Sequence, residues 1–412
     1  MEAYNNSFAA PNKDVVIIAG EASGDLHGSM LVREMKAVDP ALRVCGIGGD
    51  RMEKEGVTLV HHANELAVVG LTEVFPKLGV ILGARRKIKR LLRTKRPSLL
   101  ILIDFPDFNM PLARFAHNLG IPVFYYISPQ VWAWRKKRIH FLEQYVDRMA
   151  VILPFEEEIY RSTSLDARFV GHPLMDRVLM TCSRNEALDR LGLRPEGTII
   201  GLLPGSRERE VTSLLPCILE AAQILDSSIP DAQFVLPLAE GIPLETIDAI
   251  RRDIPLDVTV VKGRFYEALG VSNAAIVTSG TSTLEAALLG VPMVIVYRVS
   301  PLSYLLGKMF IAVDHIGLVN IIAGREVVPE YIQADAEPGK IARGLLDILT
   351  GEGRREQVSR DLEALKSMLG EPGAAVKTAA LALDLMERGI RSPGGAQAAG
   401  PEILPFRNRS AP

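Results

Sequence analysis

This 412-residue sequence lacks the features that mark secreted, membrane-spanning and metal-binding proteins. It has only three cysteines, Cys45, Cys182 and Cys217, which are scattered and form no CxxC pair, so a disulfide framework and a cysteine-based zinc site are excluded. No run reaches about 18 consecutive apolar residues, the length that a transmembrane helix needs. The polar N-terminus has no apolar core of the kind found in signal peptides. We therefore expect a cytoplasmic protein with reduced thiols.

An excess of one charge, metal-ligand spacings and a dinucleotide fingerprint are also missing. Lys and Arg number 47 against 49 Asp and Glu, which excludes a surface devoted wholly to nucleic acid, and we expect no nucleic-acid partner. His61 and His62 are adjacent and no HExxH spacing occurs, so we expect no metal site and no cofactor. The stretch GEASGD at 20–25 has the spacing G-x-x-x-G instead of GxGxxG, which argues against an NAD site.

What is present is an alternation of short apolar runs with amphipathic stretches, repeated twice along the chain. Strands that are apolar throughout and alternate with helices are typical of a parallel sheet covered on both faces. The sequence therefore predicts the α/β class, with two facing, doubly wound, Rossmann-like domains and a ligand site in the cleft at the carboxyl ends of their strands. The strand signals lie at 15–20, 42–46, 99–103, 123–127, 149–153 and 168–170, and then at 199–203, 233–236, 258–261, 274–277 and 293–297.

The same patterns set the expected domain boundaries. Both halves have the size of an ordinary domain. A polar, charged stretch separates them, and the end of the chain is rich in Gly, Pro, Ala and Ser, a composition typical of disorder. We expect a loose tail at 1–13, a first domain at 14–173, a crossover at 174–197, a second domain at 198–350, C-terminal helices at 351–388 and a disordered tail at 389–412.

The stretch TSGTSTLE at 278–285 is the first of the strand-end loops that carry polar chemistry. It follows a strand signal and precedes a helix, so its backbone N–H groups and the helix dipole favour a phosphate near residues 279–283. We place Glu285 in the first helical turn, where its carboxylate suits the two hydroxyls of a ribose. The alternative is a hydroxyl N-cap with an acidic residue in a capping box.

A second loop, LPGSR at 203–207, ends the first strand of the second half. An arginine beside a Gly-Ser turn suits a diphosphate, because its guanidinium binds phosphate oxygens bidentately. The alternative is an exposed arginine at the start of a charged run, since Glu208, Arg209 and Glu210 follow Arg207 directly.

A third loop, IDFPDFN at 103–109, places two carboxylates at the end of a buried strand. The neighbouring Phe105 and Phe108 are expected to raise the pKa of Asp104 toward a value useful for a general base. Asp107 or Asn109 is expected to cap the following helix. We favour Asp104 as the base, and the choice between Asp104 and Asp107 stays open.

A basic helix is predicted at 80–96, where eight basic residues occur without an acidic one. Ile88, Leu91 and Leu92 recur at helical spacing beside the basic face. The stripe either packs on the helix's own sheet, as in any α/β domain, or lies with the basic face against an anionic membrane surface. We favour the membrane, because a chain of net charge −2 concentrates its basic residues here and at 135–138.

Five motifs together resemble those of the lipid-A-disaccharide synthases, in the same order: GEASGD at 20–25, IDFPDFN at 103–109, SPQVWAWR at 128–135, LPGSR at 203–207 and SGTSTLE at 279–285. The resemblance implies the GT-B glycosyltransferase fold. It implies an inverting, metal-independent transfer of 2,3-diacylglucosamine from UDP-2,3-diacylglucosamine to the 6-hydroxyl of 2,3-diacylglucosamine 1-phosphate. The products are the β-1,6-linked disaccharide 1-phosphate of lipid A biosynthesis and UDP. Such enzymes associate peripherally with the inner face of the Gram-negative inner membrane.

The resemblance also implies roles for residues. The first domain takes the acceptor and faces the anionic inner leaflet, with Asp104 as base. The second domain binds the UDP-sugar, with Arg207 also catalytic and Glu285 on the ribose. The residues before Asn320 depart from the proline-containing form of the family motif. The acceptor-side residues are Gly20, Glu21, Ser23, Gly24, Asp25 and Asp107; those for the nucleotide-sugar are Gly205, Ser206, Arg207, Gly263, Ser279, Gly280, Thr281, Ser282, Thr283, Glu285 and Asn320.

Other functions remain alternatives at this point. One is a different GT-B enzyme acting on a UDP-sugar, such as an epimerase or a glycosyltransferase with a soluble acceptor, which has no use for a basic, apolar membrane face. Another is a non-catalytic nucleotide-sugar-binding protein, which has no use for a carboxylate in the cleft. The oligomeric state stays open, although a homodimer with exchanged C-terminal segments fits the family. Trp132 and Trp134 belong either to the core or to an acyl-chain site.

Overall fold

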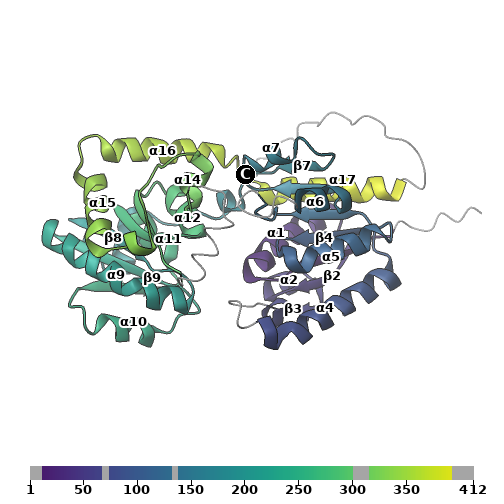
Figure 1. Ribbon diagram of the computed structural model, residues 1–412, viewed down its shortest axis with the longest axis horizontal. Helices are drawn as coiled ribbons and strands as arrows, with labels where there is room; N and C mark the ends of the chain where they lie inside the picture. Colours follow the sequence, from purple (N-terminus) through teal and green to yellow (C-terminus); the bar gives the residue numbers. More distant parts are fainter. Residues whose placement is uncertain (1–11, 67–73, 132–137, 300–314, 392–412) are drawn as a thin grey trace, which may run out of the picture.

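A computed structural model describes residues 12–66, 74–131, 138–299 and 315–391. Two lobes lie side by side and are joined by segments of the chain that pass from one lobe to the other (Figure 1). Trp132 and Trp134 lie outside the described residues, as do the basic residues 135–137 and most of the two predicted tails.

The first lobe is a seven-stranded parallel sheet in the order β3-β2-β1-β4-β5-β6-β7. Its elements are β1 (Asp14–Ala19), α1 (Ala22–Val38), β2 (Arg43–Gly48), α2 (Asp50–Lys54), β3 (Thr58–His62), α3 (Ala63–Leu66), α4 (Val74–Lys95), β4 (Leu99–Ile103), α5 (Pro106–His117), β5 (Val123–Tyr126), α6 (Arg138–Tyr145), β6 (Arg148–Val151), α7 (Glu156–Tyr160) and β7 (Asp166–Phe169).

The second lobe is a six-stranded parallel sheet in the order β10-β9-β8-β11-β12-β13. Its elements, with the connections and the C-terminal helices, are η2 (Pro173–Asp176), α8 (Arg184–Leu191), β8 (Thr198–Leu203), α9 (Glu208–Ser228), β9 (Ala232–Leu238), α10 (Leu244–Arg251), β10 (Val258–Lys262), α11 (Phe265–Val271), β11 (Ala274–Thr278), α12 (Thr281–Leu288), β12 (Met293–Tyr297), α14 (Leu318–Ala323), β13 (Glu330–Ile332), η3 (Gln333–Asp335), α15 (Pro338–Thr350), α16 (Arg354–Met368) and α17 (Ala374–Arg391).

The predicted fold class is confirmed, and each predicted strand overlaps an observed one. The central strands are buried on both faces, as the apolar runs indicated; all five residues of β4 are buried, for example. The prediction missed β3 and β13. Both lie at sheet edges and are only partly buried, so their sequences, TLVHH and EYI, carry no apolar run.

The end of the chain returns to the first lobe. Helix α17 lies across that lobe (Figure 1), and its Ala379, Ala382 and Leu383 join the core formed with α1 and the first sheet. Arg148 of β6 pairs with Asp384 of α17 at 2.6 Å and donates to the Leu381 carbonyl at 3.0 Å. The two lobes are therefore joined at two places along the chain, before η2 and before α17.

Helix α4 carries the predicted apolar stripe and basic face. Ile88 and Leu92 are fully buried in the core of the first lobe, so this part of the stripe packs on its own domain. Nearer the start of the helix, Leu78, Val80 and Leu82 are exposed. Among the described residues no helix is both long and apolar enough to cross a membrane.

Candidate active site

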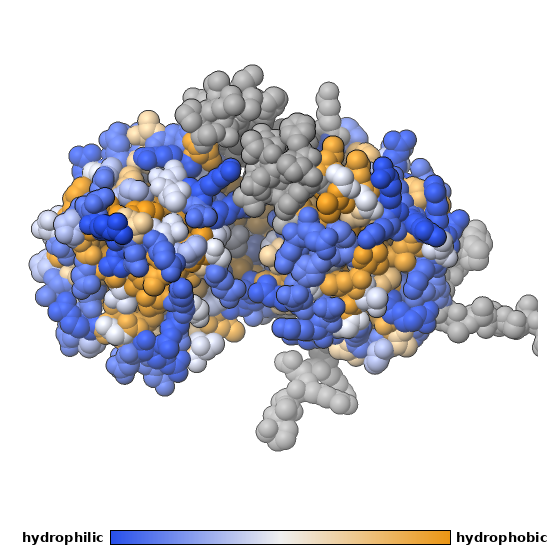
Figure 2. Space-filling view, turned by 90° about the horizontal axis from the view of Figure 1, so that it is seen from below, coloured by the Kyte–Doolittle hydropathy of each residue, from blue (hydrophilic) through white to orange (hydrophobic). Residues whose placement is uncertain are grey.

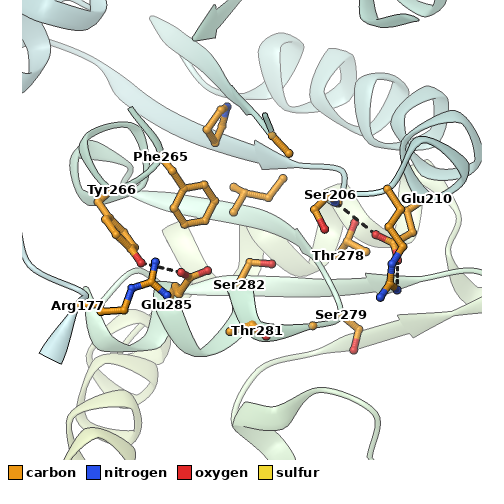
Figure 3. A pocket seen from close by; sticks show the side chains of 16 residues that line it. Arg177, Ser206, Glu210, Phe265, Tyr266, Thr278, Ser279, Thr281, Ser282 and Glu285 are labelled. Carbon is orange, nitrogen blue, oxygen red and sulfur yellow. Dashed lines mark hydrogen bonds and ion pairs between the residues drawn. The ribbon is translucent and has the colours of Figure 1, made fainter. Parts of the chain in front are cut away.

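The largest of three described cavities that contain predicted site residues lies in the second lobe, at the carboxyl ends of β8 and β11 (Figure 3), and has a volume of about 470 Å³. The surface view from below shows a hollow between the two lobes (Figure 2), and Arg177 of the connection between them is among the residues that line the cavity. The cavity brings together segments that are distant in the sequence. It is lined by eight predicted residues, Gly205, Ser206, Arg207, Ser279, Gly280, Thr281, Ser282 and Glu285.

The turn from β11 into α12 forms one wall of this cavity. Helix α12 begins at Thr281 after Gly280, whose N-cap position has no side-chain hydrogen bond, so the capping-box interpretation is wrong. Thr278 also lines the cavity, and its buried hydroxyl has no hydrogen-bond partner among the described residues. A helix N-terminus with unpaired backbone N–H groups and a buried, unpartnered hydroxyl suits an anion. Thr283 faces inward instead, because its hydroxyl donates to the Gly280 carbonyl at 2.8 Å.

Glu285 lies on the same wall, in the second turn of α12 and not in the first turn as predicted. Burial raises the pKa of its carboxyl, whereas the hydrogen bond from Tyr266 and the charge of Arg177 lower it. The Tyr266 hydroxyl donates to Oε1 of Glu285 at 2.8 Å (Figure 3). One oxygen of the carboxylate is thereby fixed, and a fixed carboxylate facing a cavity is a ready acceptor for sugar hydroxyls.

Arg207 lines the cavity, and its partner Glu210 lies at the opposite end of it from Glu285 (Figure 3). The Arg207 side chain is exposed and pairs with Glu210 at 3.0 Å. Glu210 also accepts from the main-chain N–H of Ser206 at 3.3 Å and so holds the loop at 205–207. Gly205 has φ +112, a conformation that favours glycine, and a Cβ there would lie 2.7 Å from the Glu210 carboxylate. The arginine is thus both an exposed member of the charged run and a residue of the cavity.

Asp104 lies at the end of β4 in the first lobe and lines a cavity of about 210 Å³. The pKa of its carboxyl is raised to about 6, first by burial and then by the charge of Glu21, against the lowering effect of a hydrogen bond from the Phe105 backbone. The predicted rise is therefore present. A carboxyl group with a pKa near 6 is largely ionised at pH 7 and still basic enough to take a proton.

The backbone at Asp104 is held in an uncommon conformation. Asp104 and Phe105 have φ of +43 and +47, the left-handed region that residues other than glycine rarely adopt. The carbonyl of Asp104 accepts from the Asn109 amide at 2.7 Å and from the Tyr125 hydroxyl at 2.7 Å. Such strain persists only where the surroundings hold it, and it gathers at functional sites.

Neither predicted residue caps α5. The N-cap is Phe105, without a side-chain bond, so the prediction of Asp107 or Asn109 as cap is wrong. Asn109 is fully buried and reaches back to β4, because its amide donates to the Ile103 and Asp104 carbonyls. Asp107 faces outward, with its side chain 75% exposed, and pairs with Arg138 of α6.

The loop at 20–25 lies next to Asp104. Glu21 acts on the Asp104 pKa through its charge. A Cβ on Gly20 would lie 2.2 Å from the Phe105 ring, so glycine permits this contact, and Gly24 packs on Ala19. Asp25 has a different role, since its buried carboxylate accepts from the main-chain N–H groups of Gly49, Arg51 and Met52 at 2.7, 3.2 and 3.0 Å. Ser23 is exposed at the start of α1.

Comparison with known proteins agrees with the motifs. Residues 15–382 match the family model described as lipid-A-disaccharide synthetase. The chain is 52% identical over 378 residues to the lipid-A-disaccharide synthase of Syntrophus aciditrophicus (strain SB), covering 92% of this chain and 99% of the relative. It is 48% identical over 376 residues to that of Geobacter sulfurreducens, covering 91% and 98%. This chain belongs to the lipid-A-disaccharide synthase family. It is therefore an enzyme, a glycosyltransferase of lipid A biosynthesis, as the resemblance implied.

Solved structures show the fold alone. A UDP-N-acetylglucosamine 2-epimerase from Neisseria meningitidis bound to UDP-GlcNAc superposes with a TM-score of 0.59 at 11% identity, covering 91% of this chain and all of that one. The calicheamicin glycosyltransferase CalG4 superposes with a TM-score of 0.58 at 15% identity, covering 93% of this chain and all of that one. The predicted GT-B fold is thus confirmed. Because the epimerase shares this fold, it is the family match that separates the synthases from that alternative.

Besides Thr283, two residues predicted to bind the nucleotide-sugar, Gly263 and Asn320, do not line the large cavity. Gly263, with φ +70, lines an adjoining cavity of about 330 Å³ that shares Phe265 and Tyr266 with the first. Asn320 is fully buried. Its amide nitrogen donates to Val328 O at 2.8 Å and to Glu330 at 2.7 Å, and its oxygen accepts from the N–H groups of Val327 and Val328. The hydrogen-bonding groups of the Asn320 side chain are therefore satisfied by residues of the second lobe.

Glu330 connects this network to the large cavity. Its carboxylate accepts from the main-chain N–H groups of Ile316 and Gly317 at 2.9 and 3.0 Å, and the Ile316 carbonyl accepts from the Ser279 hydroxyl at 3.3 Å. Asn320 and Glu330 thus act on the large cavity through the segment at 315–317. Nothing local in the EYI sequence of β13 signals this role.

Arg177 is a lining residue that sequence reasoning missed. It follows η2 in the connection between the lobes and points toward Tyr266 and Glu285 (Figure 3). Its charge also contributes, after burial, to a pKa of about 4 for His27 of α1. A guanidinium that acts on Glu285 in one lobe and on His27 in the other lies between the two. The sequence offered one indication of this, that Arg177 lies within the predicted crossover at 174–197.

Proposed function

We propose that the large cavity of the second lobe binds UDP-2,3-diacylglucosamine and that the Asp104 cavity of the first lobe receives 2,3-diacylglucosamine 1-phosphate. The observation that carries this assignment is the pair of cavities at strand carboxyl ends. One combines a helix N-terminus, an arginine and a fixed carboxylate, and the other contains a buried carboxyl with a pKa of about 6. Phosphates and a ribose suit the first set, and a reacting hydroxyl suits the second.

On the donor side, the diphosphate lies against the start of α12 and the loop at 205–207. Both places offer main-chain N–H groups, and Arg207 adds a charge. Glu285, held by Tyr266, accepts from the ribose hydroxyls. The uracil contacts the backbone around Gly263 in the adjoining cavity. Asn320 and Glu330 keep Ser279 in place through the Ile316 carbonyl.

On the acceptor side, Asp104 takes the proton of the 6-hydroxyl as the oxygen attacks the anomeric carbon of the donor sugar. The bond from that carbon to the UDP phosphate oxygen breaks as the β-1,6 bond forms. Negative charge grows on the departing UDP, where Arg207 and the α12 N-terminus stabilise it. The raised pKa of Asp104 suits this step, because a base works best when its pKa lies near the operating pH.

The test is UDP release from purified protein supplied with both acylated substrates. Wild type should turn over, and Asp104→Asn, which keeps the shape and removes the basicity, should be slower by about 10²–10⁴-fold. UDP affinity should stay unchanged in this variant. A silent Asp104→Asn together with a strongly impaired Asp107→Asn would assign the base to the other carboxylate. Turnover of the donor without any lipid acceptor would instead favour an epimerase-like activity.

A membrane-facing surface on α4 fits lipid substrates. Leu78, Val80 and Leu82 are exposed near the start of the helix, and Arg86, Lys87 and Arg90 are exposed along it. Each basic residue near an anionic leaflet contributes on the order of 1 kcal/mol, screened by salt. Peripheral binding to the inner face of the inner membrane through this surface lets both lipids reach the cleft without leaving the bilayer.

A further inference from the structure

A cation shares the Asp104 cavity. Arg138, the first residue of α6, lines it together with Asp104, Ser128 and Gln130. Its side chain is only 16% exposed, and an arginine buried to this degree requires an anion nearby. The guanidinium pairs with Asp107 of the first α5 turn and not with Asp104. The Asp104 carboxyl and the Arg138 guanidinium therefore line one cavity without forming an ion pair with each other.

Two arginines reach the turn that contains Asp107. Arg85 of α4 donates to the Asp107 carbonyl at 3.0 Å and lies over the Phe108 ring at 5.3 Å, so a second guanidinium reaches the same turn. Asp107 itself is mostly exposed to solvent, which weakens its hold on Arg138. An anion of higher charge that enters the cavity can bind the Arg138 guanidinium bidentately, and Asp107 then remains solvated by water.

The size of the cavity restricts what enters. Its volume of about 210 Å³ is below the roughly 300–1,000 Å³ usual for a drug-sized ligand. It therefore admits a sugar headgroup and leaves acyl chains outside. Among sugar headgroups, the one that matches an arginine and a base in the same cavity bears both a phosphate monoester and a reacting hydroxyl.

We propose that Arg138 binds the 1-phosphate of the acceptor while Asp104 faces its 6-hydroxyl, an inference that rests on the function proposed above. The ring then spans the cavity between cation and base. This arrangement presents the correct hydroxyl and selects a phosphorylated acceptor over its dephosphorylated form. Arg138 is thus a specificity-determining residue, and the ligand class is a sugar phosphate monoester.

The experiment compares two acceptors with identical acyl chains, one with the 1-phosphate and one with a free 1-hydroxyl. Wild type should prefer the phosphate by about 10- to 100-fold in kcat/KM, the usual worth of a charge-assisted hydrogen bond. Arg138→Met should abolish this preference by slowing only the phosphorylated acceptor. Arg138→Lys should retain part of it, because the charge stays and the fork is lost. Asp107→Asn should keep the preference.

The matched control is Arg114→Met, which removes an arginine of the same lobe that lies over the Tyr145 ring at 5.7 Å and lines neither cavity. Unchanged UDP affinity in Arg138→Met shows that the variant is folded. Glucosamine 1-phosphate should bind wild type without membranes and bind Arg138→Met at least about 10-fold more weakly.

Two results would overturn the inference. One is an equal loss on both acceptors in Arg138→Met, the signature of a structural role. The other is an intact phosphate preference with weaker vesicle binding, which would assign Arg138 to phospholipid headgroups. Failure of wild type to glycosylate either acceptor, with glucosamine 1-phosphate still bound through Arg138, would contradict the proposed function and leave the phosphate subsite standing.

Discussion

The Asn109 amide donates to the main-chain carbonyl of Asp104 at 2.7 Å and thereby links the first turn of α5 to the end of β4. The same amide reaches the Ile103 carbonyl at 3.2 Å, and the Tyr125 hydroxyl joins at Asp104 from β5. These bonds hold a non-glycine residue in the left-handed region, so the direction of the Asp104 side chain depends on groups that do not themselves line its cavity.

Replacing Asn109 with Ala should therefore reduce kcat by about 10-fold or more with UDP affinity unchanged, because a misplaced base loses more in the reaction than in binding. The free energy of unfolding should fall by about 1–3 kcal/mol, since buried carbonyls lose their donor. Tyr125→Phe should have a smaller effect of the same kind. A normal pH–rate profile and normal kcat in Asn109→Ala would show that the amide is only structural.

The pKa of Asp104 predicts how activity and stability depend on pH. Its folded value of about 6 lies above the ordinary 3.8 because of burial. Activity as a base should fall tenfold per pH unit below about 6. For a carboxyl raised on folding, the folded state holds the proton more tightly, so stability rises as pH falls from about 6 to 4 and the ionised group destabilises the fold above that range.

Asp104→Asn should accordingly increase the free energy of unfolding at pH 7.5 by about 2–3 kcal/mol, from a shift of about two pKa units. The gain should shrink as pH falls through 6 to 4 and vanish below the ordinary pKa of 3.8, where the Asp104 carboxyl is neutral in both the folded and the unfolded protein. Denaturant titrations of the two proteins across this pH range measure this. Equal stability at pH 7.5 would mean that the carboxyl is solvated and ordinary.

On the donor side, Glu285→Ala should weaken UDP binding by about 1–3 kcal/mol, because ribose hydroxyls lose a buried acceptor. Tyr266→Phe should cost less, since Glu285 keeps its charge. Calorimetric titration with UDP measures both. Glu220→Ala, an exposed carboxylate of α9 that lines neither cavity, is the control. Unaltered UDP affinity in Glu285→Ala would end the ribose assignment.

Arg207→Ala should lower kcat more than it weakens UDP-sugar binding. The guanidinium already pairs with Glu210 in the absence of ligand, so its attraction adds most when charge grows on the departing diphosphate. Arg209→Ala removes a neighbouring exposed arginine that does not line the cavity and should be close to wild type. Separate measurements of KM and kcat distinguish a role in catalysis from a role in binding. A rise in KM with unchanged kcat would show that Arg207 contributes to binding alone.

For the membrane surface, the structure narrows the test to the exposed basic residues of α4. Arg85 and Lys89 lie over the Phe108 and Phe115 rings, so they are left unchanged. Replacing Arg86, Lys87 and Arg90 with Glu should release the protein from anionic vesicles at low salt while UDP binding persists. The control variant replaces Arg252, Arg355 and Arg360, which are exposed in the second lobe, with Glu. It changes the net charge by the same amount and should stay bound to the vesicles. Full retention of the α4 variant would remove this helix from the membrane surface.

The sequence alone determined the fold class and the loops that bear the chemistry. Parallel strands buried on both faces must be apolar throughout, so they stand out in the sequence, and the residues that follow them reach the same sheet edge. Ser206, Ser282 and Glu285 could be placed together for that reason, and Asp104 could be placed at a strand end. The edge strands β3 and β13 were not predicted, because partly buried strands carry no apolar run in the sequence.

Only the tertiary structure decided which polar groups meet. The charge of Arg177, in the connection between the lobes, acts on Glu285. The side-chain amide of Asn320 donates to Glu330 of β13. Asn109 donates back to the end of β4, although its sequence position predicted a helix cap. Arg148 donates a hydrogen bond to Asp384, which lies 236 positions later in the sequence. Hydrogen bonds and desolvation depend on distances between segments that folding brings together, whereas a sequence pattern reports only how each segment meets its own sheet.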